Sequence, residues 1–286
     1  MVSQTVREHT LHDWIDKLAQ ARYLADESLA AMVRLAVLLH RPLLLEGPAG
    51  VGKTALAQAL AKSLQRELVR LQCYEGIESQ QALYEWNYHK QLADLAQNSS
   101  VDVFSEDYLL ARPLLRALQS RQGAVLLIDE VDRADEAFEA MLLEFLADHQ
   151  VSVPEYKTVS AHLEPVVVLT SNRTRPLSDA LRRRCLYYYV DWPTSALEQN
   201  VVALHVPELS EVQTKKLVYA VRLMRTWNLI KPPGLAETLD WSRAFAADTD
   251  AGFDERWALQ TLGCVIKDAI DLKTVRERIR ELFDDT

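Results

Sequence analysis

The chain has 286 residues, of which 49% are hydrophobic and 26% charged, a composition typical of a folded globular protein with a substantial core. Its formal net charge of −9 argues against sequence-independent binding of nucleic acid, which requires a basic surface. Cys73, Cys185 and Cys264 are isolated and far apart in the sequence, so they show no metal-ligand pairing and no disulfide framework. Each is expected to be a small buried residue in a reducing compartment. With no signal-peptide core and no apolar run of membrane-spanning length, a cytoplasmic protein without membrane contact is expected.

Short apolar runs alternate with helix-period segments through the first two thirds of the chain. Runs of this length suit strands that are buried on both faces of a parallel sheet, so the alternation predicts an α/β fold. The predicted strands are Leu43–Glu46, Leu68–Leu71, Ala124–Asp129, Val166–Thr170 and Leu186–Val190. The predicted helices between them are Lys53–Leu64, Gln80–Gln97, Glu106–Arg121 and Glu136–Asp148.

The last third of the chain carries helical patterns alone. We therefore predict an α/β domain over residues 1–193, with an N-terminal helix, and an all-helical domain over residues 194–286. A β-hairpin at Val151–Ser160 is expected as an insertion, either as a plain surface hairpin or as a contact for a partner or substrate. The predicted C-terminal helices are Ser195–Val206, Glu211–Trp227, Leu239–Asp248, Glu255–Ile270 and Lys273–Asp284.

A glycine-rich segment follows the first predicted strand and opens the first predicted helix. It matches the phosphate-binding pattern G-x-x-x-x-G-K-[ST] at every fixed position. Backbone N–H groups can wrap closely around phosphate oxygens in such a loop, and the following helix adds the positive end of its dipole. We expect ATP to bind here, with Lys53 at the β- and γ-phosphates and Thr54 on Mg²⁺. The loop residues are Gly47, Pro48, Ala49, Gly50, Val51, Gly52, Lys53 and Thr54.

Two carboxylates, Asp129 and Glu130, end the strand Ala124–Asp129. A buried charge without a partner is costly, so Asp129 is expected to hold Mg²⁺ through its water shell. Glu130 is expected to orient and deprotonate the attacking water. The alternative is an acid pair that only begins a turn. With the phosphate loop upstream, the pair favours hydrolysis over phosphoryl transfer to a metabolite.

A third strand ends in Thr170, Ser171 and Asn172. Asn172 is expected to hydrogen-bond the γ-phosphate or the attacking water, although an asparagine after a strand can simply form a turn. The chain has no Asn-Lys-x-Asp guanine-reading motif, which disfavours a GTPase.

With these motifs in this order and helices at the C-terminus, the chain resembles an AAA+ ATPase. Within that class it resembles the MoxR family, and in particular its CoxD-like branch, which is associated with maturation of carbon monoxide dehydrogenase. The resemblance extends from about Tyr23 to Phe283 and implies a P-loop fold with a five-stranded parallel sheet and a helical lid. The segments that carry it are Leu71–Gly76, Ala82–Tyr88, Leu110–Leu115, Ile128–Ala134 and Leu177–Leu186.

The resemblance implies further site residues. AAA+ proteins usually form hexameric rings in which one subunit lends an arginine to the γ-phosphate of its neighbour. Arg184 best matches that position, but Arg182 and Arg183 precede it directly, and all three could be a solvated helix end. Arg243 best matches the phosphate-sensing residue of the lid, or it lies on a solvated helix face. Arg133 is expected at a subunit contact rather than in catalysis.

The resemblance also implies a function. The chain is expected to be a remodelling chaperone that activates a metalloenzyme client together with a von Willebrand factor A domain partner. Force is expected to reach the client through the helix around Tyr84, Trp86 and Tyr88 and through the hairpin. An AAA+ motor acting on nucleic acid is the alternative, which the acidic charge disfavours, and a small-molecule kinase is a third possibility.

Overall fold

The computed structural model of the chain describes residues 10–97, 101–153, 156–248 and 252–283. Contacts divide the chain into two units. The first contains nearly all described residues up to Tyr189. The second begins at Val190 and also contains residues 22–24 and the loop segment Gly47–Gly52.

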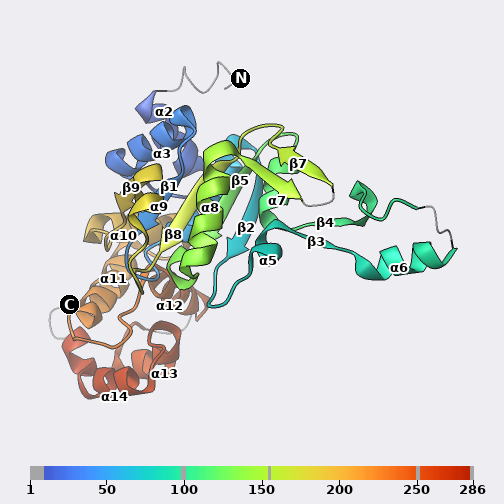
Figure 1. Ribbon diagram of the computed structural model, residues 1–286. Coiled ribbons are helices and arrows are strands. Elements are labelled where there is room, and N and C mark those ends of the chain that lie inside the picture. Colours follow the sequence, from blue (N-terminus) through green and yellow to red (C-terminus); the bar gives the residue numbers. More distant parts are fainter. Residues whose placement is uncertain (1–9, 98–100, 154–155, 249–251, 284–286) are drawn as a thin grey trace. The chain divides into compact units, whose positions relative to one another are not determined.

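A parallel five-stranded sheet forms the centre of the first unit, with the strand order β2-β5-β8-β1-β9 (Figure 1). Every residue of β1, β5 and β8 is buried, which confirms the expectation for the central strands. The edge strands β2 and β9 are only partly buried. All five strands lie within two residues of the predicted bounds: β1 Leu43–Glu46, β2 Glu67–Gln72, β5 Ala124–Asp129, β8 Val166–Ser171 and β9 Leu186–Tyr189.

Four helices of the first unit, α2, α3, α8 and α9, begin at side-chain caps. Thr10 forms a capping box with Asp13, and the side chains of Asp26, Asp135 and Ser178 accept hydrogen bonds from backbone N–H groups in the first turns. Such caps satisfy donors that the helix leaves unpaired. The helices are α2 Leu11–Gln20, α3 Glu27–Leu39, α4 Lys53–Leu64, α7 Pro113–Gln119, α8 Glu136–Asp148 and α9 Asp179–Arg184.

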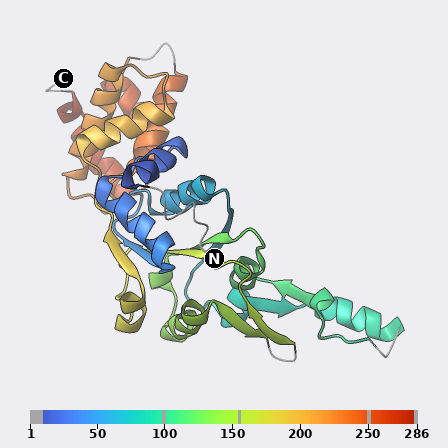
Figure 2. The same ribbon diagram turned by 90° about the horizontal axis from the view of Figure 1, so that it is seen from above.

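The segment between β2 and β5 differs from the prediction of two long helices. Tyr84–Trp86 is strand β3, which pairs antiparallel with β4, Leu109–Ala111. The rings of Tyr84 and Phe104 pack edge-on against Trp86, and this packing together with the strand pairing overrides the helical pattern. The two strands form an arm that carries α6 away from the sheet (Figures 1 and 2). The remaining elements are α5 Ser79–Leu83, α6 Tyr88–Gln97 and the 3₁₀ turn Glu106–Tyr108.

Strands β6, Gln150–Val153, and β7, Lys157–Ser160, form an antiparallel hairpin. Residues 154–155 of the predicted hairpin lie outside the described residues.

The second unit is helical and is built around an aromatic cluster. Trp241 stacks on Trp257 with ring centroids 5.6 Å apart, and Phe245 meets Trp257 edge-on at 4.9 Å. The predicted helix Glu255–Ile270 ends earlier, because Asp268 caps a new helix. The helices are α10 Ser195–His205, α11 Glu211–Arg225, α12 Leu235–Ala247, α13 Glu255–Val265 and α14 Ala269–Glu277, followed by the 3₁₀ turn Ile279–Leu282. The predicted end of the last helix, Asp284, lies outside the described residues.

Cys73 and Cys185 are buried, and burial raises the pKa of each thiol to about 12. Cys264 is partly exposed, so its predicted burial is wrong. Among the described residues, no helix is long and apolar enough to cross a lipid bilayer.

Candidate active site

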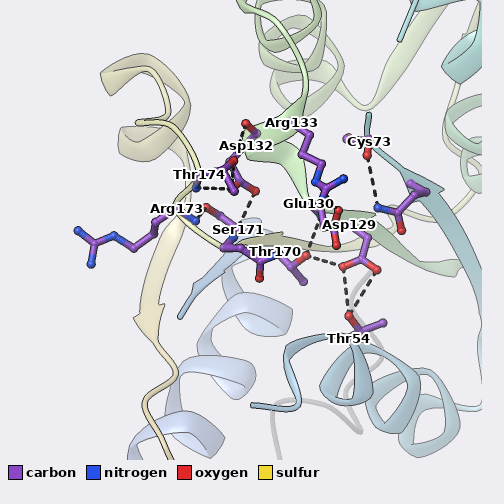
Figure 3. A network of polar contacts seen from close by, with 12 residues as sticks. Thr54, Cys73, Asp129, Glu130, Asp132, Arg133, Thr170, Ser171, Arg173 and Thr174 are labelled. Carbon is purple, nitrogen blue, oxygen red and sulfur yellow. Dashed lines mark hydrogen bonds and ion pairs between the residues drawn. The ribbon is translucent and has the colours of Figure 1, made fainter. Parts of the chain in front are cut away.

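The polar ends of β5 and β8 lie side by side in the sheet. Ile128 pairs with Leu169 in the parallel register, which places the next residues, Asp129 and Thr170, beside each other. The Thr170 hydroxyl donates to Asp129 Oδ1 and accepts a hydrogen bond from the backbone N–H of Glu130 at 2.9 Å (Figure 3). One threonine thus fixes both the buried carboxylate and the peptide of the next acidic residue.

The carboxylate of Asp129, a residue that is 3% exposed, also contacts groups from two other elements. Thr54 Oγ1, on α4, lies 3.1 Å from Asp129 Oδ1 and 3.4 Å from Oδ2 (Figure 3). From β2, Arg70 Nη2 donates to Asp129 Oδ2 at 2.6 Å. The guanidinium supplies the opposite charge that a buried carboxylate requires.

Lys53 and Asn172 are joined by a hydrogen bond of 2.8 Å from Nζ to Oδ1. The lysine is buried, and its burial lowers the pKa of the ammonium group. The negative charges of Asp132, Asp129 and Glu130 oppose that shift. The predicted phosphate-binding lysine and the asparagine at the end of β8 therefore occupy one polar cluster.

Asp132 holds the chain that carries Asn172. Its carboxylate accepts the backbone N–H of Asn172 at 3.2 Å, and both the N–H and the hydroxyl of Thr174 at 2.7 Å (Figure 3). Burial opposes ionisation of this aspartate, but the hydrogen bonds from Thr174 and Asn172 outweigh it and lower its pKa. Asp132 is thus an ionised residue whose carboxylate holds the Asn172 backbone by a hydrogen bond.

Glu130 has a left-handed backbone conformation, with φ of 54° and ψ of 47°. This region is uncommon for a residue with a side chain and costs of the order of 1 kcal/mol, and such residues concentrate at functional sites. The Glu130 carboxylate is 31% exposed and pairs with Arg133 at 2.8 Å. The sharp change of direction after β5 thus separates the partly exposed Glu130 from the buried Asp129.

The glycine-rich loop Gly47–Gly52 has the backbone that its sequence predicts. At Gly50 and Gly52 φ is +78° and +98°, where a side chain would be strained. A Cβ atom at Gly47 would lie 2.0 Å from the carbonyl oxygen of Val190, so any side chain there would clash.

The three consecutive arginines at the end of α9 lie in different surroundings. Arg184 donates from Nη1 to the backbone carbonyl of Leu143 in α8. Arg182 lies 3.6 Å from the buried carboxylate of Glu46 and 5.3 Å over the ring of Tyr187. Arg183 is exposed, and its carbonyl accepts a hydrogen bond from Arg41. The assignment of Arg184 as the trans-acting arginine therefore stays a prediction. In that role its side chain would have to give up the hydrogen bond to the Leu143 carbonyl in α8.

Arg243 lies within α12, pairs with Asp240 at 3.1 Å and is 54% exposed. It follows the first residue of the helix, Leu235, by eight positions, which corresponds to roughly 12 Å along the axis. The phosphate loop contacts the other end of this helix, because the backbone N–H of Leu235 donates to the carbonyl of Gly50 at 2.8 Å. The lid-sensor role of Arg243 therefore stays a prediction, and these contacts give it no support.

The chain was compared with models of known protein families. Residues 42–185, half of the chain, match the model described as AAA domain (dynein-related subfamily). The chain belongs to this AAA-domain family. The match contains Lys53, Thr54, Asp129, Glu130 and Asn172.

Curated relatives of this AAA protein include gas vesicle ATPases and a chaperone. Gas vesicle ATPase GvpN1 of Halobacterium salinarum is 25% identical over 86% of this chain and 74% of its own. GvpN of Haloferax mediterranei is 26% identical over 65% of this chain and 56% of its own. Chaperone protein ClpB 2 of Parasynechococcus marenigrum is 34% identical over 46% of this chain and 13% of its own. Among solved structures, a RuvB variant of Thermotoga maritima is 18% identical, with a TM-score of 0.48 over 96% of this chain and 73% of its own.

Membership of the AAA family confirms the predicted P-loop fold and identifies the protein as an ATPase. Nucleotide binding follows from this membership, and AAA+ proteins commonly form oligomeric rings.

Three polar residues of the AAA site were not predicted from the sequence: Arg70, Asp132 and Thr170. Thr170 ends a predicted strand and Asp132 lies in the segment Ile128–Ala134, but the groups that they bond to are about 40 residues away in the chain. Arg70 gave no sequence signal, since an arginine on an edge strand is usually solvated.

Proposed function

We propose that the loop Gly47–Thr54 binds the phosphates of ATP and that Glu130 directs water against the γ-phosphate. Two hydrogen bonds support this proposal most directly, because they join the last two residues of the loop to the ends of strands β8 and β5. Lys53 bonds to Asn172, and Thr54 bonds to Asp129. An ammonium, a hydroxyl, a carboxylate and an amide are thus gathered in one cluster, as phosphoryl transfer requires.

The chemistry of these residues fits Mg²⁺. The Thr54 hydroxyl and the Asp129 carboxylate offer the hard oxygen ligands that this ion prefers, and they already lie 3.1 Å apart. In this structure the Arg70 guanidinium neutralises the Asp129 carboxylate. When Mg²⁺ binds, Arg70 would have to share that carboxylate with the ion or move away from it. When bound, the ion neutralises charge on the phosphate oxygens.

In the proposed reaction, water attacks the γ-phosphorus, the bond from the γ-phosphorus to the bridging oxygen breaks, and ADP and phosphate leave. Glu130 accepts the proton of the water, for which its carboxylate is accessible. Asn172 and Lys53 hold the γ-phosphate, and Asp132 keeps the Asn172 backbone in place. Arg184 of a neighbouring subunit is proposed to stabilise the transition-state charge.

We propose further that hydrolysis drives remodelling of a client protein in a MoxR-type ring. The gas vesicle and ClpB relatives support a remodelling role. The von Willebrand factor A domain partner and the metalloenzyme client rest on the sequence resemblance to the CoxD-like branch alone. The client-contacting elements are proposed to be the β6–β7 hairpin and α6, where Tyr88 and Leu92 expose 62% and 67% of their surface.

Purified Glu130→Gln protein tests this function. It should bind ATP, release no phosphate above background and remain assembled, so that a tagged copy retains its client from the native cell. The matched control is Lys53→Ala, which should retain neither nucleotide nor client. Stimulation of wild-type turnover by DNA, with no client retained, would favour the nucleic-acid motor instead.

A further inference from the structure

Two glycines, Gly50 of the phosphate loop and Gly234 before α12, approach each other more closely than side chains permit. A Cβ atom at Gly234 would lie 2.8 Å from the Gly50 Cα atom and 3.0 Å from its carbonyl carbon. Gly234 has φ of −86° and ψ of −175°, which any residue can adopt. The close approach, and not the backbone conformation, therefore requires glycine at position 234.

A hydrogen bond accompanies this contact. The N–H of Leu235, the first residue of α12, donates to the carbonyl of Gly50 at 2.8 Å. This N–H has no acceptor within its own helix, so the loop satisfies it. Because a trans peptide is planar with its C=O and N–H pointing in opposite directions, the bond directs the N–H of Val51 away from α12.

Buried charges hold the start of α12 in place. Arg225 donates from Nε to the carbonyl of Pro233 at 2.6 Å, and its other nitrogens bond to both oxygens of Glu198 at 2.8 and 2.6 Å. Glu198 is fully buried and also accepts from Thr238 of α12 at 2.7 Å. The Gly234 N–H is held by the Glu237 carboxylate at 2.8 Å.

We propose that the turn Pro233–Leu235 is a positioning element for nucleotide binding, with Gly234 and the N–H of Leu235 as its contacting groups. It fixes the Gly50–Val51 peptide in the orientation that turns the Val51 N–H into the loop. Arg225 and Glu198 act through it as positioning residues. This inference rests on the proposed binding of ATP phosphates by Gly47–Thr54.

The loop therefore depends on the helical unit as well as on its own glycines. A turn supported by a buried ion pair is rigid, so the loop is held ready before nucleotide arrives, and rigidity of this kind lowers the entropy lost on binding. In this arrangement the lid contacts the phosphate loop through backbone atoms.

Gly234→Ala tests the close approach. The affinity for a fluorescent ATP analogue should fall by about tenfold or more, while the melting temperature of the nucleotide-free protein stays within a few degrees. The matched control is Gly263→Ala in α13, where a Cβ atom would meet no other atom within 4 Å. Its affinity should equal that of the wild type.

Leu235→Pro tests the hydrogen bond separately. Proline is well tolerated at the first position of a helix and follows an extended residue without strain, so the substitution removes mainly the N–H that Gly50 accepts. Glu211→Pro is the matched control, since Glu211 is the first residue of α11. Weaker binding in Leu235→Pro and unchanged binding in Glu211→Pro are expected.

The outcomes separate this inference from the proposed function. Wild-type affinity in both Gly234→Ala and Leu235→Pro, with binding lost in Lys53→Ala, would overturn the positioning role alone. Wild-type affinity in Lys53→Ala would overturn the phosphate site itself. If Gly234→Ala melts early, Leu235→Pro decides the question by the same affinity measurement.

Discussion

Lys53 and Asn172 are 119 residues apart in the chain, yet the lysine ammonium donates to the asparagine amide oxygen at 2.8 Å. The lysine comes from the phosphate loop and the asparagine from the end of β8. The lysine that we propose to bind phosphate thus donates a hydrogen bond to the asparagine that we propose to contact the same phosphate or the attacking water. Both residues should therefore affect nucleotide chemistry, but at different steps.

Lys53→Ala should abolish nucleotide binding, because it removes the charge that meets the β- and γ-phosphates. Asn172→Ala should keep the dissociation constant within a few-fold and lower turnover by about 10²-fold or more, as expected for loss of one transition-state hydrogen bond. Equilibrium titration with an ATP analogue and a phosphate-release assay separate the two effects. Equal loss of binding in both variants would contradict the division of roles.

Asp132→Asn should lower turnover in the same direction as Asn172→Ala, because Asp132 holds the Asn172 and Thr174 backbone N–H groups. It should also change the acid stability. Since the pKa of Asp132 is lowered below its ordinary value of 3.8, the aspartate stabilises the fold above that pH. This contribution is lost as the pH falls through the folded-state pKa.

Urea unfolding of wild type and Asp132→Asn between pH 6 and pH 3 measures this effect. The free-energy difference between the two proteins should be constant near pH 6 and shrink at the acid end. If the difference in unfolding free energy grew on acidification, Asp132 would not be the stabilising, ionised residue that we infer.

Arg133→Ala should have little effect on turnover. Its ion pair with Glu130 is largely exposed, and exposed pairs contribute about 0–1 kcal/mol. Turnover within about fivefold of the wild type is therefore expected in a steady-state ATPase assay. A loss as large as that of Glu130→Gln would assign Arg133 to the reaction itself.

Alanine substitutions at Arg182, Arg183 and Arg184 should identify the trans-acting arginine. The responsible variant should keep nucleotide binding and lose turnover. Mixed with Lys53→Ala subunits, it should regain activity, because some interfaces then combine an intact loop with an intact arginine. We expect this for Arg184, and the same result at Arg183 alone would move the role by one residue.

Glu198→Ala should destabilise the helical unit strongly. It leaves Arg225, which is 10% exposed, without its carboxylate, and breaking a buried ion pair costs about 3–5 kcal/mol. Chemical denaturation monitored by tryptophan fluorescence measures the change. Lys215→Ala, which breaks the exposed pair with Glu211, is the control and should cost less than about 1 kcal/mol.

The parts of the site that are local in the chain could be predicted from the amino-acid sequence. The glycines of the phosphate loop, Lys53, Thr54 and the Asp129–Glu130 pair follow from spacing, because each depends on a strand followed directly by a turn or helix. The five strands were predicted because parallel strands buried on both faces need continuous apolar runs. The family follows from the same segments.

Contacts between segments that are distant in the chain could be found only from the folded structure. Tyr84–Trp86 is a strand because it pairs with β4. Since β4 lies over twenty residues further along the chain, the local sequence pattern did not reveal this pairing. Thr170 and Asp132 acquire their roles from residues about 40 positions distant. The phosphate loop, evident from its pattern alone, is held by Gly234, and no local pattern reveals which glycine must approach another backbone.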